Sequence, residues 1–144
     1  MDRIEFLSGY HNLEIKIQKK REYIAFCEER SLAIPGPSYG EKIGSNPNQN
    51  TDAPFVKWIY KKIEAETELK ELEVKAAKTK LEIEESIANL KNDDFERILT
   101  YRYIDWLTWD EIGSRMYLSR STIKRWHKDA LESVSYTHLR AHET

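Results

Sequence analysis

The sequence contains a single cysteine, Cys27, which excludes an internal disulfide framework and suits a reducing compartment. No apolar run approaches the ~20 residues that a helix needs to span a bilayer, so we expect no membrane partner. The first residues also lack the basic start and the apolar stretch of a signal peptide. These absences together predict a cytoplasmic protein.

Glycine and proline are scarce, with five and four residues among 144, and most of them lie in one segment. Charged residues make up 33% of the chain and hydrophobic residues 40%, so a largely helical protein is expected. The net charge of −2 excludes a globally basic, histone-like binder. Any nucleic-acid site must therefore be a local basic patch.

Motifs of catalytic and metal sites are also missing. The four histidines have no cysteine partners and no zinc-ligand spacing. The sequence has no phosphate-binding loop, no dinucleotide-binding glycine pattern and no nucleophile elbow. We therefore expect no metal, no cofactor and no enzymatic activity.

Apolar residues between Ile4 and Arg30 recur mostly three, four or seven apart, which predicts a helix with one buried face. They are Phe6, Tyr10, Leu13, Ile17, Ile24 and Cys27. Residues 31–53 are rich in glycine, proline, serine and asparagine. We predict a loop there that joins two long antiparallel helices, and a disordered linker is the alternative.

A second long helix is predicted to begin near Ala53 and Pro54, because proline is tolerated in a first turn, and to run to about Lys91. Its apolar residues form a near-heptad stripe: Phe55, Trp58, Ala65, Leu69, Leu72, Ala76, Ile83 and Leu90. Such a helix is ~55 Å long, too long for one small core. It needs a partner, which is the N-terminal helix folded back, a second copy of the chain, or both. We thus expect residues 1–91 to form a coiled-coil-like hairpin.

Residues 92–134 are expected to form three short helices. Asp93 and Glu96 have the spacing of a capping box at the start of the first helix. Thr108 and Glu111 repeat this spacing at the start of the second. The predicted architecture is therefore all-α, with a long hairpin followed by a trihelical module.

The segment from Thr108 to Glu132 has the pattern of a helix-turn-helix. Gly113 provides a small residue where the two helices cross closely, and Ser119 can cap the second helix. Tyr117 occupies a turn position where glycine is common, which predicts an altered turn or backbone strain. The residues expected to form a trihelical core include Phe95, Ile98, Leu99, Ile112, Met116, Leu118, Ile123, Trp126, Ala130 and Leu131.

The solvent side of the predicted second helix is basic, and no acidic residue occurs between Ile112 and Lys128. A recognition helix presents such a surface to the base edges and phosphates of double-stranded DNA. Arginine can donate two hydrogen bonds to guanine, and hydroxyls near helix starts can donate to phosphates. The predicted DNA-binding residues are Thr108, Arg115, Ser119, Arg120, Ser121, Thr122, Lys124, Arg125 and Lys128. We expect His127 to flank the DNA or to cap the basic patch.

The stretch YRYIDWLTWDEIGSRMYLSRSTIKRWHKDALE resembles the C-terminal module of small regulators from Gram-positive phages and prophages. These are the ArpU/RinA-like late transcriptional regulators, whose helix-turn-helix resembles region 4 of sigma factors. The matching residues are Arg102, Tyr103, Ile104, Trp109, Tyr117, Ser119, Arg125, His127, Ala130 and Leu131. The resemblance implies sequence-specific DNA binding during late-gene activation in a bacterial host cell.

Two other functions fit the same pattern. A phage terminase small subunit also joins a helix-turn-helix to long helices, but it assembles into rings for genome packaging. A helical adaptor would use the basic face to bind an acidic protein. RNA polymerase is a further candidate partner, and the long helices are candidates for a homodimer interface.

The last residues, 135–144, break the apolar periodicity of the chain. They resemble translated sequencing-adapter sequence, so we expect a non-native tail or a short disordered one. We exclude them from the predicted fold.

Overall fold

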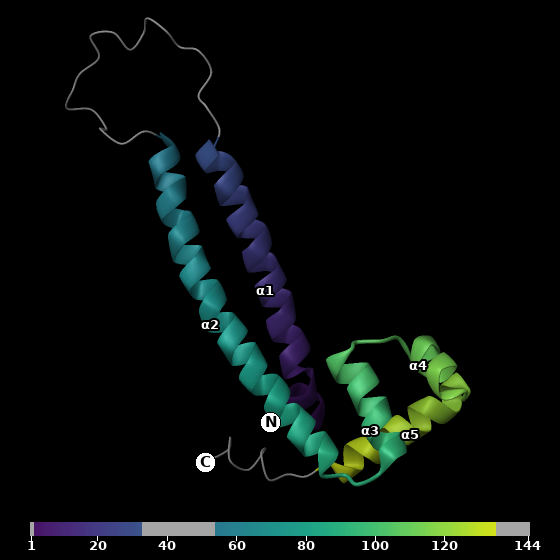
Figure 1. The fold of residues 1–144 in the computed structure, drawn as a ribbon. Helices are drawn as coiled ribbons and strands as arrows, with labels where there is room; N and C mark the ends of the chain where they lie inside the picture. The colour runs from purple at the N-terminus through teal and green to yellow at the C-terminus, as the bar shows by residue number, and fades with distance from the viewer. Residues whose placement is uncertain (1, 33–53, 135–144) are drawn as a thin grey trace, which may run out of the picture. The chain divides into compact units, whose positions relative to one another are not determined.

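The computed structural model describes residues 2–32 and 54–134. In these ranges every regular element is a helix and no strand occurs, which confirms the predicted all-α class. The elements are α1 (Arg3–Leu32), α2 (Pro54–Ala88), α3 (Asp93–Leu99), the π-helical turn η1 (Thr100–Ile104), α4 (Trp109–Met116) and α5 (Arg120–Ser133) (Figure 1). The predicted loop, apart from its first two residues, and the predicted tail at 135–144 lie outside the described residues.

Among the described helices, none combines the length and the apolar character that crossing a membrane requires.

The chain divides into two compact units. The first unit takes residues 2–15 and 74–134 of the described chain, and the second takes 16–32 and 54–73. Both long helices therefore contribute to both units. The predicted short-helix module, residues 92–134, lies in the first unit together with the start of α1 and the end of α2.

One core cluster of the first unit combines the long helices with the short ones. Its buried members are Phe6, Leu7, Ile83, Ile87, Leu99, Tyr103, Ala130 and Val134. Leu99 and Ala130 are fully buried here, whereas the sequence analysis assigned them to a self-contained trihelical core. Neighbouring residues on a helix point about 100° apart, so Leu99 turns away from Ile98 and toward the cluster that includes the long helices. The short helices thus share a core with the hairpin segments.

A second cluster of the first unit lies between the short helices themselves. Ile98 of α3, Ile112 of α4 and Ile123 of α5 form it, and all three side chains are fully buried. Partly buried neighbours pack around them, namely Tyr101, Leu107, Trp109, Met116, Leu118 and Trp126. This cluster confirms the inward orientation predicted for Ile112 and Ile123.

The second unit is an antiparallel pair of helix segments. Lys20 of α1 forms an ion pair with Glu68 of α2, and Glu28 lies 3.8 Å from the amino group of Lys62. The later residue of α1 pairs with the earlier residue of α2, so the two segments run in opposite directions. Exposed pairs of this kind each contribute only ~0–1 kcal/mol, whereas full burial of a side chain such as Ile17 contributes ~1.5–3 kcal/mol.

The first short helix is capped one residue earlier than predicted. The side-chain oxygen of Asn92 accepts hydrogen bonds from the backbone N–H groups of Asp94 and Phe95, at 3.0 and 3.2 Å. The capping box predicted for Asp93 and Glu96 is therefore wrong, because Asp93 already belongs to the helix. Its carboxylate remains in the first turn, where the helix dipole favours negative charge.

Candidate nucleic-acid interface

Gly113 allows α4 and the start of α5 to approach closely. The backbone N–H groups of Tyr117 and Leu118 both donate to the carbonyl oxygen of Gly113, the latter at 3.0 Å. A Cβ atom at position 113 would lie 2.7 Å from the carbonyl oxygen of Leu118, too close for a real contact. It would also lie 3.9 Å from Cγ1 of Ile123 on α5. The structure thus confirms that this crossing requires glycine.

The turn between α4 and α5 contains a left-handed residue. Tyr117 ends α4 with φ 57° and ψ 41°, the conformation in which glycine is usual. The sequence left open an altered turn or backbone strain at Tyr117. The structure has the usual left-handed turn, and the backbone of Tyr117 is strained. The Tyr117 side chain is 93% exposed.

Two hydroxyl caps determine where α4 and α5 begin. Thr108 forms the predicted capping box with Glu111: its Oγ1 accepts from the Glu111 N–H at 3.2 Å and donates to the carboxylate at 2.9 Å. Ser119 caps α5 by accepting from the Thr122 N–H at 3.3 Å, and its hydroxyl donates to Oγ1 of Thr122 at 2.9 Å. The hydroxyl protons of Thr108 and Ser119 are thus engaged within the chain.

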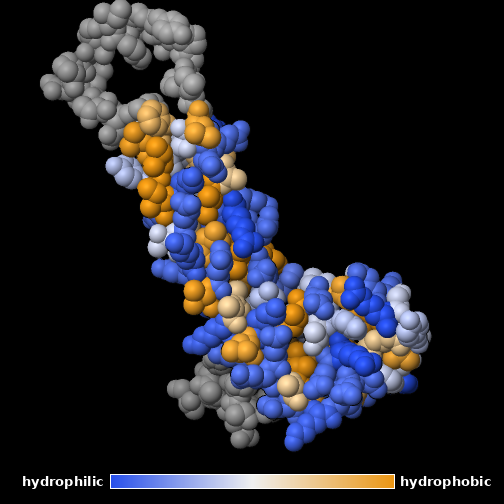
Figure 2. Space-filling model, viewed as in Figure 1, coloured by the Kyte–Doolittle hydropathy of each residue, from blue (hydrophilic) through white to orange (hydrophobic). Residues whose placement is uncertain are grey.

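The outer face of α5 carries the cations predicted from the sequence. The helix is held from behind by Ile123 and Ala130, which are fully buried. On the opposite side, five exposed residues recur at three- and four-residue intervals: Arg120, Ser121, Lys124, Arg125 and Lys128. We call these five residues the α5 outer face. The view in Figure 2 shows a predominantly hydrophilic surface in the region of α4 and α5.

The four cations of the α5 outer face are exposed. In the described part of the chain, no ion pair and no ring contact engages Arg120, Lys124, Arg125 or Lys128. Arg115 differs, because its guanidinium lies over the ring of Tyr101 at 5.5 Å. The structure therefore groups five of the predicted site residues on one helix face. Thr108, Arg115, Ser119 and Thr122 lie outside this group, at the ends of α4 and the start of α5.

Arg102 and two tryptophans fix the segment that leads into α4. The guanidinium of Arg102 lies 5.3 Å from the Trp106 ring and 4.3 Å from the Trp109 ring. Its Nη1 also donates to the carbonyl oxygen of Leu107 at 2.9 Å. The sequence analysis noted Arg102 only within the family resemblance. Its proximity in sequence to Trp106 and Trp109 was the available signal for this packing role.

His127 faces the interior of the first unit. Its Nε2 lies 2.7 Å from the hydroxyl oxygen of Tyr103, and its ring packs edge-on against Trp109. Burial, and secondarily the nearby Arg102, lowers the pKa of His127 from 6.5 to about 4. The imidazole is therefore neutral at physiological pH and joins α5 to η1. That His127 flanks DNA or caps the basic patch stays a prediction.

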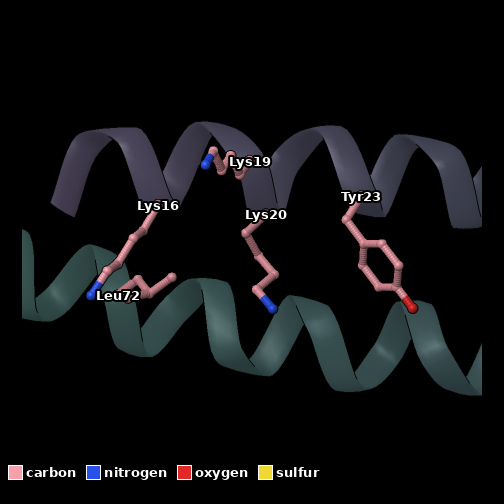
Figure 3. Close-up of a pocket in the computed structure, with 5 residues that line it drawn as sticks. All are labelled: Lys16, Lys19, Lys20, Tyr23 and Leu72. Atoms are coloured by element: carbon pink, nitrogen blue, oxygen red, sulfur yellow. The ribbon is translucent and has the colours of Figure 1, made fainter. Parts of the chain in front are cut away.

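A basic groove that the sequence analysis did not identify lies in the second unit. It has a volume of about 340 Å³ and is lined by Lys16, Lys19, Lys20 and Tyr23 of α1 with Leu72 of α2. Figure 3 shows Lys16, Lys20 and Tyr23 extending from α1 toward α2. The charge of Lys20 is balanced by Glu68, which leaves two lysines to give the groove its positive charge.

Comparison with models of known protein families finds a match that covers α2 and the short helices. The model of the family described as "Protein of unknown function (DUF1492)" matches residues 40–135, which is more than half of the chain. The matched region contains α2 and all of the short helices, including the α5 outer face. No curated protein and no solved structure matches the chain. The chain belongs to the DUF1492 family.

Proposed function

We propose that this protein binds double-stranded DNA through the α5 outer face and acts as a sequence-specific transcriptional regulator. The observation that carries the proposal is a set of four exposed cations without ion-pair partners in the described chain, on one face of a helix fixed from behind by Ile123. Desolvating unpaired charge needs an anionic partner, and the phosphates of a duplex supply regularly spaced ones. Because the net charge of the whole chain is −2, the cluster of cations on α5 is not a consequence of a generally basic composition.

The geometry of α4 and α5 suits binding in the major groove. A major groove about 12 Å wide admits one α-helix, and base edges are read from the first turns of that helix. Arg120 and Lys124 occupy the first turns of α5, so we assign them to base contacts. Lys128 lies one turn further along the same face, where phosphate contact is favoured.

Regulation of phage late transcription is the finer form of this proposal. It rests on the resemblance of residues 101–132 to ArpU/RinA-like activators, and the DUF1492 family is typical of phage proteins. The resemblance to region 4 of sigma factors makes RNA polymerase the proposed protein partner.

Single alanine variants test the assignment of roles. We expect Arg120→Ala and Lys124→Ala to weaken binding to a selected site by about 1–3 kcal/mol each and to relax its sequence preference. Lys128→Ala should weaken binding to all duplexes equally and reduce the salt slope by about one. Lys75→Ala is the matched control, because Lys75 is an exposed lysine on α2.

These variants are compared on duplexes selected by the wild-type protein from a random pool. Equal affinity of the Arg120, Lys124 and Lys75 variants for the selected site would contradict the assignment. A palindromic selected site would indicate a two-fold symmetric dimer.

The long helices offer a surface for the proposed homodimer. In the second unit, Tyr60 and Ile63 of α2 are 66% and 54% exposed, and Leu32 of α1 is 73% exposed. Hydrophobic surface is visible along this part of α2 in Figure 2. Tyr60→Glu should convert the dimer into a monomer, as measured by light scattering. A monomeric wild-type protein would contradict the proposed homodimer. A wild-type ring of eight or more chains would favour the alternative function, genome packaging.

A further inference from the structure

Three residues other than glycine adopt a positive φ angle in the described chain: Lys91, Trp106 and Tyr117. An aromatic residue in this region costs free energy, because its Cβ atom crowds the following carbonyl oxygen. Trp106 gains packing from its conformation, since its ring stacks on His11 with a centroid separation of 3.6 Å and an interplanar angle of 7°. The strain at Trp106 is therefore offset by a contact within the fold.

Tyr117 has no such contact. Its side chain is 93% exposed, and no ring contact or side-chain hydrogen bond engages it in the described part of the chain. Glycine would adopt φ 57° and ψ 41° without strain and would preserve the hydrogen bond from this residue's N–H to Gly113. Among the described residues the tyrosine ring therefore makes no contact that offsets its strain, and an interaction with a partner molecule would account for it.

The position of Tyr117 points to the partner. It ends α4 two residues before Ser119, which caps α5, and Arg120 at the start of the α5 outer face follows directly. In a helix-turn-helix, the turn before the recognition helix runs close to the DNA backbone, which the first helix crosses. A phenol there can donate a hydrogen bond to a phosphate oxygen, and its ring can pack on the adjoining sugar.

We propose that Tyr117 is a DNA-backbone contact, in which its hydroxyl donates to a phosphate and its ring covers the neighbouring sugar. The inference rests on the proposed function of the α5 outer face. A phosphate contact carries no base information, so Tyr117 strengthens binding to every duplex equally and helps to set the register of α5 in the groove. Strain in the turn is retained because the ring is used when DNA is bound.

The test combines stability with binding. Tyr117→Gly removes both the ring and the strain, and Tyr117→Phe removes the hydroxyl alone. We expect Tyr117→Gly to raise the midpoint of thermal unfolding by a few degrees while weakening binding on the order of tenfold, on selected and random duplexes alike. Tyr117→Phe should give an intermediate loss of affinity with an unchanged midpoint. Tyr23→Phe, at another exposed tyrosine that lies on α1, should leave affinity unchanged.

Wild-type affinity in Tyr117→Gly would overturn the inference. If that variant binds normally while the Arg120, Lys124 and Arg125 triple alanine variant does not bind, the proposed function stands and only the role of Tyr117 fails. If the wild-type protein binds no duplex at all, both fail. A lowered unfolding midpoint in Tyr117→Gly would also overturn it, because the ring would then serve the fold.

Discussion

The close approach at Gly113 makes a quantitative prediction about the helix-turn-helix. In Gly113→Ala, the new methyl group would lie 2.7 Å from the carbonyl oxygen of Leu118. The obstacle is a backbone atom and cannot rotate away as a flexible side chain can. The turn and the start of α5 must therefore move, and with them the N–H of Leu118, which donates to the carbonyl oxygen of Gly113.

Two opposing effects set the magnitude. Overpacking of this kind costs ~1–3 kcal/mol. Alanine in place of glycine inside a helix returns ~0.5–1 kcal/mol, because the unfolded chain loses less backbone freedom on folding. At the middle of the two ranges the net loss of unfolding free energy is about 1 kcal/mol, and their extremes give ~0 and ~2.5 kcal/mol. For a chain of 144 residues the unfolding midpoint falls by roughly 2–4 °C per kcal/mol.

Gly9→Ala is the matched control for this substitution. Gly9 also lies inside a helix, but a Cβ atom there would meet only Cγ2 of Thr79 at 3.6 Å, an ordinary van der Waals contact. The Gly9→Ala substitution should therefore stabilise the protein by ~0.5–1 kcal/mol. Urea and thermal unfolding followed by circular dichroism measure both variants. A Gly113→Ala protein as stable as the wild type, or more stable, would refute the reasoning.

Three further predictions concern single side chains. Ser86 is fully buried, and its hydroxyl has no hydrogen-bond partner in the described chain. Ser86→Ala should therefore raise the unfolding free energy by about 1 kcal/mol, as measured by unfolding in urea. A lowered unfolding free energy would contradict this prediction. The folded-state pKa of His127 lies below its ordinary value, so the stability that its neutral form contributes is complete above pH 6.5 and is lost as the pH falls toward 4. His127→Gln should flatten the stability profile between these pH values, and an unchanged slope would exclude His127 as its source. Ser119→Ala removes the cap of α5 and should cost about 1 kcal/mol of unfolding free energy, whereas Ser121→Ala, at an exposed neighbour, should cost little.

Local patterns explain the parts of the site that could be predicted. A capping serine or threonine acts on groups two or three residues away, so Thr108 and Ser119 were recognisable from spacing alone. Helical periodicity likewise placed Ile123 inside and Arg120 outside. The need for glycine at position 113 follows from the short connection between two crossing helices.

Long-range packing explains what sequence reasoning missed. His127 is an apparent member of the basic face by position, but its partner Tyr103 lies 24 residues away in the chain. Leu99 and Ala130 face the long-helix segments. Helical periodicity shows that a side chain is buried, but it does not show whether that side chain packs on the other short helices or on the long ones. The cap of α3 was displaced by one residue because several capping residues follow one another there, and only Asn92 has the extended backbone that a cap requires.

The central claim is that the α5 outer face binds duplex DNA. It is tested most directly by fluorescence anisotropy of a labelled duplex, titrated with the wild-type protein and with the Arg120, Lys124 and Arg125 triple alanine variant at several salt concentrations. The wild type should bind, with affinity that falls linearly with salt on a double logarithmic scale. The triple variant should keep its helical circular dichroism and lose binding. Equal affinity of the two folded proteins would contradict the account.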